Sequence, residues 1–63
     1  MNIQRILRPL YDGQWHKLDE LTAETKVNKE AVLEIADSLE HYGFTELSND
    51  KQAVRLKEDF LHL

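Results

Sequence analysis

The chain has 63 residues, no cysteine and a formal net charge of −4 at pH 7. So short a chain buries only about 60% of the surface that its unfolded form exposes, which leaves room for one core and a single domain over residues 1–63. The lack of cysteine excludes a disulfide framework, thiolate metal sites and thiol catalysis. The negative charge speaks against a surface built for indiscriminate nucleic-acid binding, because such surfaces are usually basic.

The sequence also lacks the segments that direct a chain into or across a membrane. No apolar run approaches the roughly 18 residues of a membrane span, and residues 1–5 do not show the basic and then apolar pattern of a secretory signal. We therefore expect a cytoplasmic protein without a membrane partner.

Apolar residues at helical spacing predict a first helix over residues 2–12. They are Ile3, Ile6, Leu7, Leu10 and Tyr11. Pro9 lies inside this pattern and is expected to bend or loosen the last turn, and the helix ends at Gly13. Residues 14–17 are too few for a helix, so we expect a brief extended segment that presents Trp15 to the core and serves as a third sheet strand.

Two more helices are predicted, with a short break between them. The first covers residues 18–25 and has acidic residues in its first turn, where the helix dipole favours negative charge. Asn28 is a good N-cap for a helix of about fifteen residues, 28–42. Gly43 is the expected left-handed residue that ends this helix.

Residues 45–48 and 53–57 alternate with period two on either side of the turn-rich residues 49–52, which predicts a β-hairpin. The buried face of the hairpin is expected to hold Leu47, Val54 and Leu56. Thr45 shares that face, at a position where an apolar residue would fit better.

The last residues, 58–63, are too apolar to be left in water comfortably, since Phe60, Leu61 and Leu63 lie among them. We expect this tail to pack on the first helix, or on a second copy of the chain, with more weight on the first. Because large aromatic residues dominate small cores, Trp15 and the remaining aromatics are also expected to be packing residues. These are Tyr11, Tyr42 and Phe44.

The order of these elements resembles the small winged-helix domains of prokaryotic transcription regulators, over nearly the whole chain. The resemblance is carried by Ile6-Leu7, Asp12-Gly13-Gln14-Trp15-His16, Leu18-Asp19-Glu20-Leu21, Val27-Asn28-Lys29-Glu30-Ala31-Val32, Leu39-Glu40-His41-Tyr42-Gly43-Phe44 and Val54-Arg55-Leu56. It implies an α+β winged helix-turn-helix fold with three helices, a C-terminal β-hairpin wing and a short third strand.

In that family the helix after the turn usually enters the DNA major groove, and the wing touches phosphates. The resemblance therefore implies a DNA-binding module of the transcription-regulator type, with double-stranded DNA as the partner. The contacts that it implies are Lys26, Asn28, Lys29 and Lys51, with Arg55 and Lys17 in reserve.

The exposed face of helix 28–42 departs from the family pattern. Glu30, Glu34, Asp37 and His41 recur at spacings of three and four, so they form one outward strip, called the acidic strip below. Across the helix, Lys29 stands against Glu30, Glu34, Asp37 and Glu40, which sums to −3. A second interpretation therefore stays open, a winged-helix module that binds a protein partner or a second copy of itself. Its contacts are the acidic strip, or Phe60 and Leu63 of the tail.

Nothing in the sequence predicts an enzyme. His16, His41 and His62 are far apart, and none pairs at helical spacing with a second metal-ligating His or Cys. Glu34 and Asp37 lie on an open convex face, without the burial that carboxyl groups in acid–base catalysis usually have. We predict no catalytic residue, no metal and no cofactor.

Overall fold

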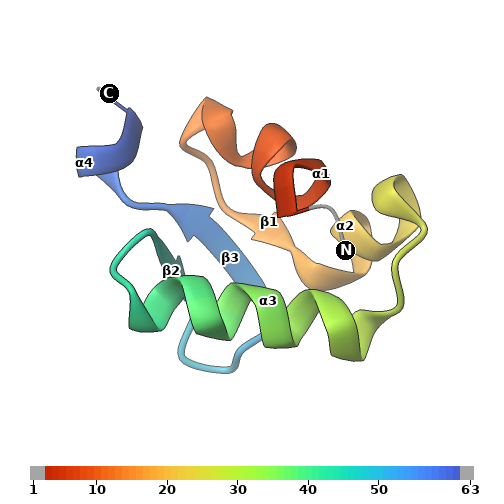
Figure 1. Ribbon diagram of the computed structural model, residues 1–63. Coiled ribbons are helices and arrows are strands. Elements are labelled where there is room, and N and C mark those ends of the chain that lie inside the picture. The colour runs from red at the N-terminus through yellow and green to blue at the C-terminus, as the bar shows by residue number, and fades with distance from the viewer. Residues whose placement is uncertain (1–2, 62–63) are drawn as a thin grey trace.

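The computed structural model describes residues 3–61, which form helices and a three-stranded sheet (Figure 1). Their bounds are α1 Ile3–Leu7, the 3₁₀ helix η1 Arg8–Asp12, β1 His16–Lys17, α2 Leu18–Thr25, α3 Lys29–His41, β2 Thr45–Leu47, β3 Ala53–Leu56 and α4 Glu58–Leu61. Within these residues, no helix combines the length and the apolar character that a membrane crossing requires.

The first predicted helix is two helices of different type. Residues 3–7 are α-helical, and residues 8–12 continue as a 3₁₀ helix with Pro9 in its first turn. Pro9 is tolerated there because a first-turn N–H has no partner inside the helix to lose. Gly13 then ends η1 with a left-handed backbone (φ 75°) and donates its N–H to the carbonyl of Leu10, 3.1 Å away.

The predicted ends of α3 are confirmed. The side chain of Asn28 accepts a hydrogen bond from the backbone N–H of Ala31 at 2.9 Å, which is an N-cap. At the other end Gly43 has φ 87°. Its N–H donates to the carbonyl of Glu40, and the N–H of Phe44 donates to the carbonyl of Leu39, both at 2.9 Å. This pair of bonds is a Schellman motif, which satisfies carbonyls that the helix leaves open.

The sheet is antiparallel, with the strand order β1-β3-β2. The predicted hairpin forms β2 and β3, and the predicted short strand pairs along the other edge of β3. The core is built from this sheet and the first three α-helices with η1. Its buried members are Ile6, Leu10, Leu18, Leu21, Val32, Ala36, Val54 and Leu56.

Thr45 is fully buried, opposite Leu56 in the register of β2 and β3. Its hydroxyl donates a hydrogen bond to the carbonyl of Ala36 at 3.1 Å. A buried hydroxyl is costly only when it has no partner, so this bond explains how a polar residue occupies an apolar position. It also ties the strand to α3.

The C-terminal tail begins with a fourth helix, α4, where no helix was predicted. Phe60 is half-buried and packs against the core of its own domain. Its ring centroid lies 4.3 Å from that of Phe44. This part of the tail therefore packs on its own chain, whereas Leu63 lies outside the described residues.

Three aromatic residues that were predicted to pack inside are on the surface, so those predictions were wrong. Tyr11 is 60% exposed, Trp15 43% and Tyr42 72%. The change to a 3₁₀ helix at Pro9 alters the helical periodicity that placed Tyr11 on the inner side. The alternation of β1 turns His16 inward and leaves Trp15 outside. Tyr42 is the C-cap of α3, just past its last helical residue.

His16 joins three elements through its ring. One ring nitrogen, Nε2, lies 2.9 Å from Asp12 Oδ1 in η1, and the other, Nδ1, lies 2.9 Å from Glu20 Oε1 in α2. Burial lowers the pKa of His16, but the hydrogen bonds to Asp12 and Glu20 outweigh it, and the net shift of the pKa is upward. The N–H of Gln14 and then His16 hold the pKa of Asp12 below its usual value.

Candidate nucleic-acid interface

The turn between α2 and α3 carries the first group of predicted contacts. Lys26 is exposed and has a left-handed backbone (φ 61°), and its N–H donates to the carbonyl of Thr22 at 2.9 Å. The hydroxyl of Thr25 accepts from the N–H of Val27 at 3.3 Å, which fixes the turn. Asn28 follows, and its side-chain oxygen is engaged in the cap of α3. The turn therefore presents the Lys26 side chain to solvent.

The wing loop between β2 and β3 is organised around Ser48. Its hydroxyl donates to Asp50 Oδ1 at 2.6 Å and accepts from the N–H of Ala53 at 3.0 Å. The hydrogen bonds from Ser48 and from the N–H of Gln52 lower the pKa of Asp50. Lys51 is exposed at this tip with φ 57°, and its N–H donates to the carbonyl of Ser48 at 2.9 Å. The loop is thus a hydrogen-bonded turn with Lys51 outside.

Gln52 and Lys29 hold the wing against the helices. The N–H of Leu18 donates to the Gln52 carbonyl at 2.8 Å, and Lys29 Nζ donates to Gln52 Oε1 at 3.4 Å. Lys29 Nζ also lies 3.0 Å from Asp19 Oδ1. Sequence reasoning missed this bridge, because residues 29 and 52 are distant in the chain and neither is distinctive alone.

The two reserve contacts lie on β1 and β3. Lys17 is exposed and lines a hollow beside the wing that also contains Asp19 and Asp50. Arg55 is half-buried, its Nη2 lies 3.4 Å from Glu46 Oε2, and its Cζ lies 4.5 Å from the ring centroid of Trp15. The guanidinium of Arg55 is therefore held on the outer face of the sheet.

These cations do not merge into one positive patch. Lys17 shares its hollow with two carboxylates, and Lys29 pairs with Asp19. Lys51 lines a hollow with Glu30, Leu33, Glu34 and Asp37 of α3. Within residues 3–61, the side chain of Lys26 forms no ion pair.

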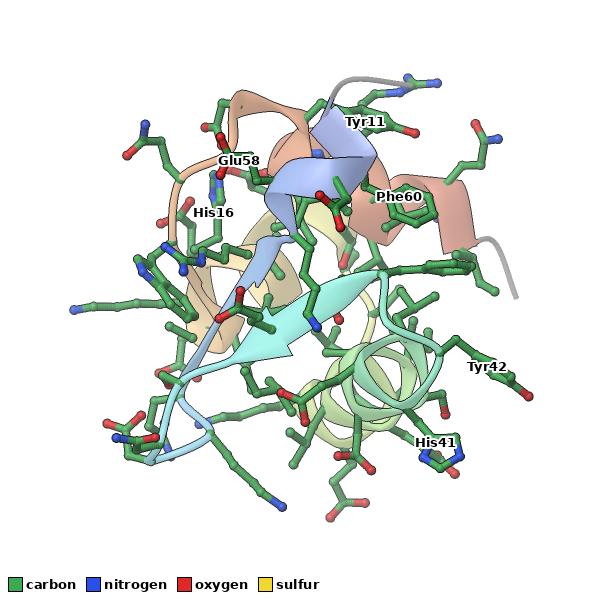
Figure 2. All side chains as sticks on the ribbon, turned by 90° about the vertical axis from the view of Figure 1, so that its left-hand side faces the viewer. Tyr11, His16, His41, Tyr42, Glu58 and Phe60 are labelled. Carbon is green, nitrogen blue, oxygen red and sulfur yellow. The ribbon has the colours of Figure 1, made fainter. Side chains whose placement is uncertain are left out.

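The acidic strip lies where the sequence predicted it. Its members, Glu30, Glu34, Asp37 and His41, are all exposed on α3, on the side away from the buried Val32, Ala36 and Leu39. Figure 2 shows His41 and Tyr42 pointing away from the body of the domain at the end of this helix. Glu40 faces elsewhere, because its Oε2 accepts a hydrogen bond from the N–H of Leu47 at 2.7 Å. The outward face of α3 is therefore acidic along its length.

Comparison with known proteins gives the fold a second support. No protein-family model matches the chain, and no curated protein sequence matches it. The crystal structure of a MarR family transcriptional regulator from Silicibacter pomeroyi is similar, with a TM-score of 0.79 and 20% sequence identity. The match covers 95% of this chain and 45% of that one, so the chain spans less than half the length of that regulator. With the strand order and the helix-turn-helix described above, this likeness shows that the predicted α+β winged helix-turn-helix fold is correct.

Proposed function

We propose that the domain binds double-stranded DNA as a module of a transcription regulator, with Lys26 and Lys51 as its main phosphate contacts. The fold supports this, since the similar structure is a transcriptional regulator and both the helix-turn-helix and the wing are complete. Each of these two units carries an exposed lysine, Lys26 in the turn between α2 and α3 and Lys51 at the wing tip.

The observation that carries the proposal is the backbone conformation of these two lysines. Lys26 and Lys51 are the non-glycine residues at positive φ in the described part of the chain. The left-handed region disfavours a residue with a Cβ by roughly 1–2 kcal/mol, a strain that glycine would not have. Strained backbone is concentrated at functional sites, and here both instances coincide with an exposed cation, which supports a phosphate-binding role for the two lysines.

The acidic strip decides how DNA is contacted. Carboxylates on the outward face of α3 are repelled by phosphates, so that face does not enter a groove deeply. DNA is contacted instead by the turn between α2 and α3 and by the wing tip. Lys17 and the N-terminal end of α3 lie beside these contacts. In this arrangement Lys29 and Arg55 contribute mainly through Asp19, Gln52, Glu46 and Trp15, the partners that they hold within the domain.

The proposal predicts that DNA affinity and stability respond oppositely to glycine at these sites. Lys26→Gly and Lys51→Gly remove the cation and relieve the backbone, so the free energy of unfolding stays the same or rises by up to about 1 kcal/mol. Each lost phosphate contact flattens the plot of log binding constant against log salt by about 0.9. Fluorescence anisotropy with a labelled duplex, over a salt series starting near 50 mM, measures this slope.

Lys57→Gly is the control, because Lys57 follows β3 at the end of the strand away from the wing tip. It should leave the salt slope of the binding constant unchanged. The proposal fails if the unmodified domain binds no duplex at the lowest salt, or if the three lysine variants lower affinity equally.

A further inference from the structure

A shallow apolar groove runs along the C-terminal half of α3, beside α1. Its lining is formed by Ile3 of α1 and by Glu34, Ile35, Ser38, Leu39 and Tyr42. Ile3 is 45% exposed and Tyr42 72%, so both of these lining side chains are open to solvent. The DNA contacts proposed above do not use any of these residues.

The shape of the groove suits a helix. Ile35 and Leu39 of α3 and the C-cap residue Tyr42 are spaced by four and three residues, so they form one ridge about 10 Å long, in which Leu39 is buried and Tyr42 is exposed. Ile3, from a second helix, lines the same groove. When helices pack together, ridges of side chains on one helix fit into grooves on its neighbour. An amphipathic helix that binds in a groove makes its contacts through apolar residues spaced three and four positions apart.

The charge beside the groove suits a basic partner. Glu34 belongs both to the groove lining and to the acidic strip, so the apolar and acidic surfaces are continuous. Within the described residues, Glu30, Glu34 and Asp37 share a hollow with Lys51 but form no ion pair and no side-chain hydrogen bond. Carboxylates without partners next to an apolar furrow attract cations that flank an apolar stripe.

We propose that this groove binds a basic amphipathic helix of a partner protein. Apolar side chains of the partner fill the space between Ile3 and the ridge on α3, and its lysine or arginine residues meet Glu34 and Asp37. A basic amphipathic helix complements both the apolar groove and the carboxylates beside it. An acidic helix would be repelled by the carboxylates, and a neutral small molecule would leave them unpaired.

A second copy of this chain fits less well. Its helices α1, α2 and α3 already bury their apolar stripes in their own core, through Ile6, Leu21 and Val32 among others. None of these three helices therefore has a free apolar stripe flanked by bases. A symmetric dimer through the groove would also bring two acidic strips close to each other, and like charges facing each other are unfavourable.

The probe for this surface is a fluorescent peptide of about 18 residues, patterned with leucine and lysine as an amphipathic helix. Two control peptides match it, one with glutamate in place of lysine and one with the same composition in scrambled order. Anisotropy should show saturable binding of the patterned leucine–lysine peptide alone. Amide shifts on titration should map to Ile35, Ser38 and Tyr42, and to Ile3 of α1.

Charge reversal at exposed positions distinguishes binding at this groove from attraction of the basic peptide to the net negative charge of the domain. Glu34→Lys should weaken the peptide at least about fivefold, the loss typical of an important interface contact. Glu24→Lys makes the same change of charge at an exposed position on α2, outside the groove, and should have little effect. Tyr42→Ser tests the apolar half and, with Tyr42 so exposed, should leave the fold intact.

Three results would overturn the proposal. One is equal loss of affinity in the Glu24 and Glu34 variants, which would indicate attraction to net charge only. Another is equal binding of the scrambled peptide. The third is concentration-dependent dimerisation in sedimentation that Tyr42→Ser abolishes, which would make a second copy the occupant.

Discussion

The guanidinium of Arg55 lies over the indole ring of Trp15, with Cζ 4.5 Å from the ring centroid. Glu46 stands opposite Arg55 in the register of β2 and β3, and its Oε2 lies 3.4 Å from Arg55 Nη2. The three side chains thus form a chain of contacts across the outer face of the sheet. It connects the segment before β1 to both strands of the hairpin, from outside the core.

Trp15→Ala should therefore destabilise the domain only modestly. A cation–π contact at an exposed site contributes about 0.5–1 kcal/mol, whereas truncation of a buried tryptophan costs about 3–5 kcal/mol. Chemical unfolding followed by circular dichroism measures the difference, since Trp15 is the one tryptophan of the chain and fluorescence is lost with it. Arg55→Ala should have a similar effect, and the double variant should be less destabilised than the two single effects added. A loss above about 3 kcal/mol for Trp15→Ala would mean that the indole is a core residue.

Trp15 also shows which features of the fold could not be predicted from the sequence. Its size predicted burial, but its side of the sheet depends on the register of β1, and His16 takes the inward position. By contrast, α2, the cap at Asn28 and the Schellman motif at Gly43 were predictable, because each is decided by residues within a few positions of one another. Features that depend on neighbouring residues could be predicted from the sequence, whereas the face of the sheet on which a residue lies could not.

The same distinction holds for the candidate interface. The sequence placed Lys26 at the turn and Lys51 at the wing tip, and it placed the acidic strip on the outward face of α3. It could not show that Lys29 is tied to Gln52 and Asp19, since that contact joins residues from three elements. Nor does helical spacing reveal a left-handed backbone at a lysine.

Thr45→Val should destabilise the domain by about 1 kcal/mol, although valine has nearly the same shape as threonine. The substitution removes the hydrogen bond from the buried hydroxyl to the carbonyl of Ala36, and a typical bond of this kind contributes about 0.5–1.5 kcal/mol. Thr22→Val is the matched control, because Thr22 Oγ1 is buried without a hydrogen-bond partner among the described residues. Its removal should leave the free energy of unfolding unchanged or raise it. Equal destabilisation in the two variants would contradict the role given to the Thr45 bond.

Asn28→Ala should lower the free energy of unfolding by about 1 kcal/mol through loss of the cap on α3. Asn28→Asp keeps an oxygen that can accept from the N–H of Ala31 and adds a negative charge at the helix N-terminus, so stability should be retained. Asn49→Ala, at an exposed position in the wing loop, is the control. Urea unfolding of the three variants tests the assignment, which fails if Asn28→Ala and Asn49→Ala have the same midpoint.

The bridge from His16 to Asp12 and Glu20 should make stability depend on pH. The pKa of His16 is raised in the folded domain, because the hydrogen bonds to the two carboxylates outweigh the burial that lowers it. The stabilisation is therefore complete below the unfolded value of about 6.5 and is lost as pH rises through the higher folded value. Urea midpoints measured upward from about pH 6 should fall with pH, and the fall should disappear in His16→Gln. Asp12→Asn and Glu20→Gln each remove one carboxylate and should reduce the fall of the urea midpoint with pH. A fall of the same size in His16→Gln would show that another group is responsible.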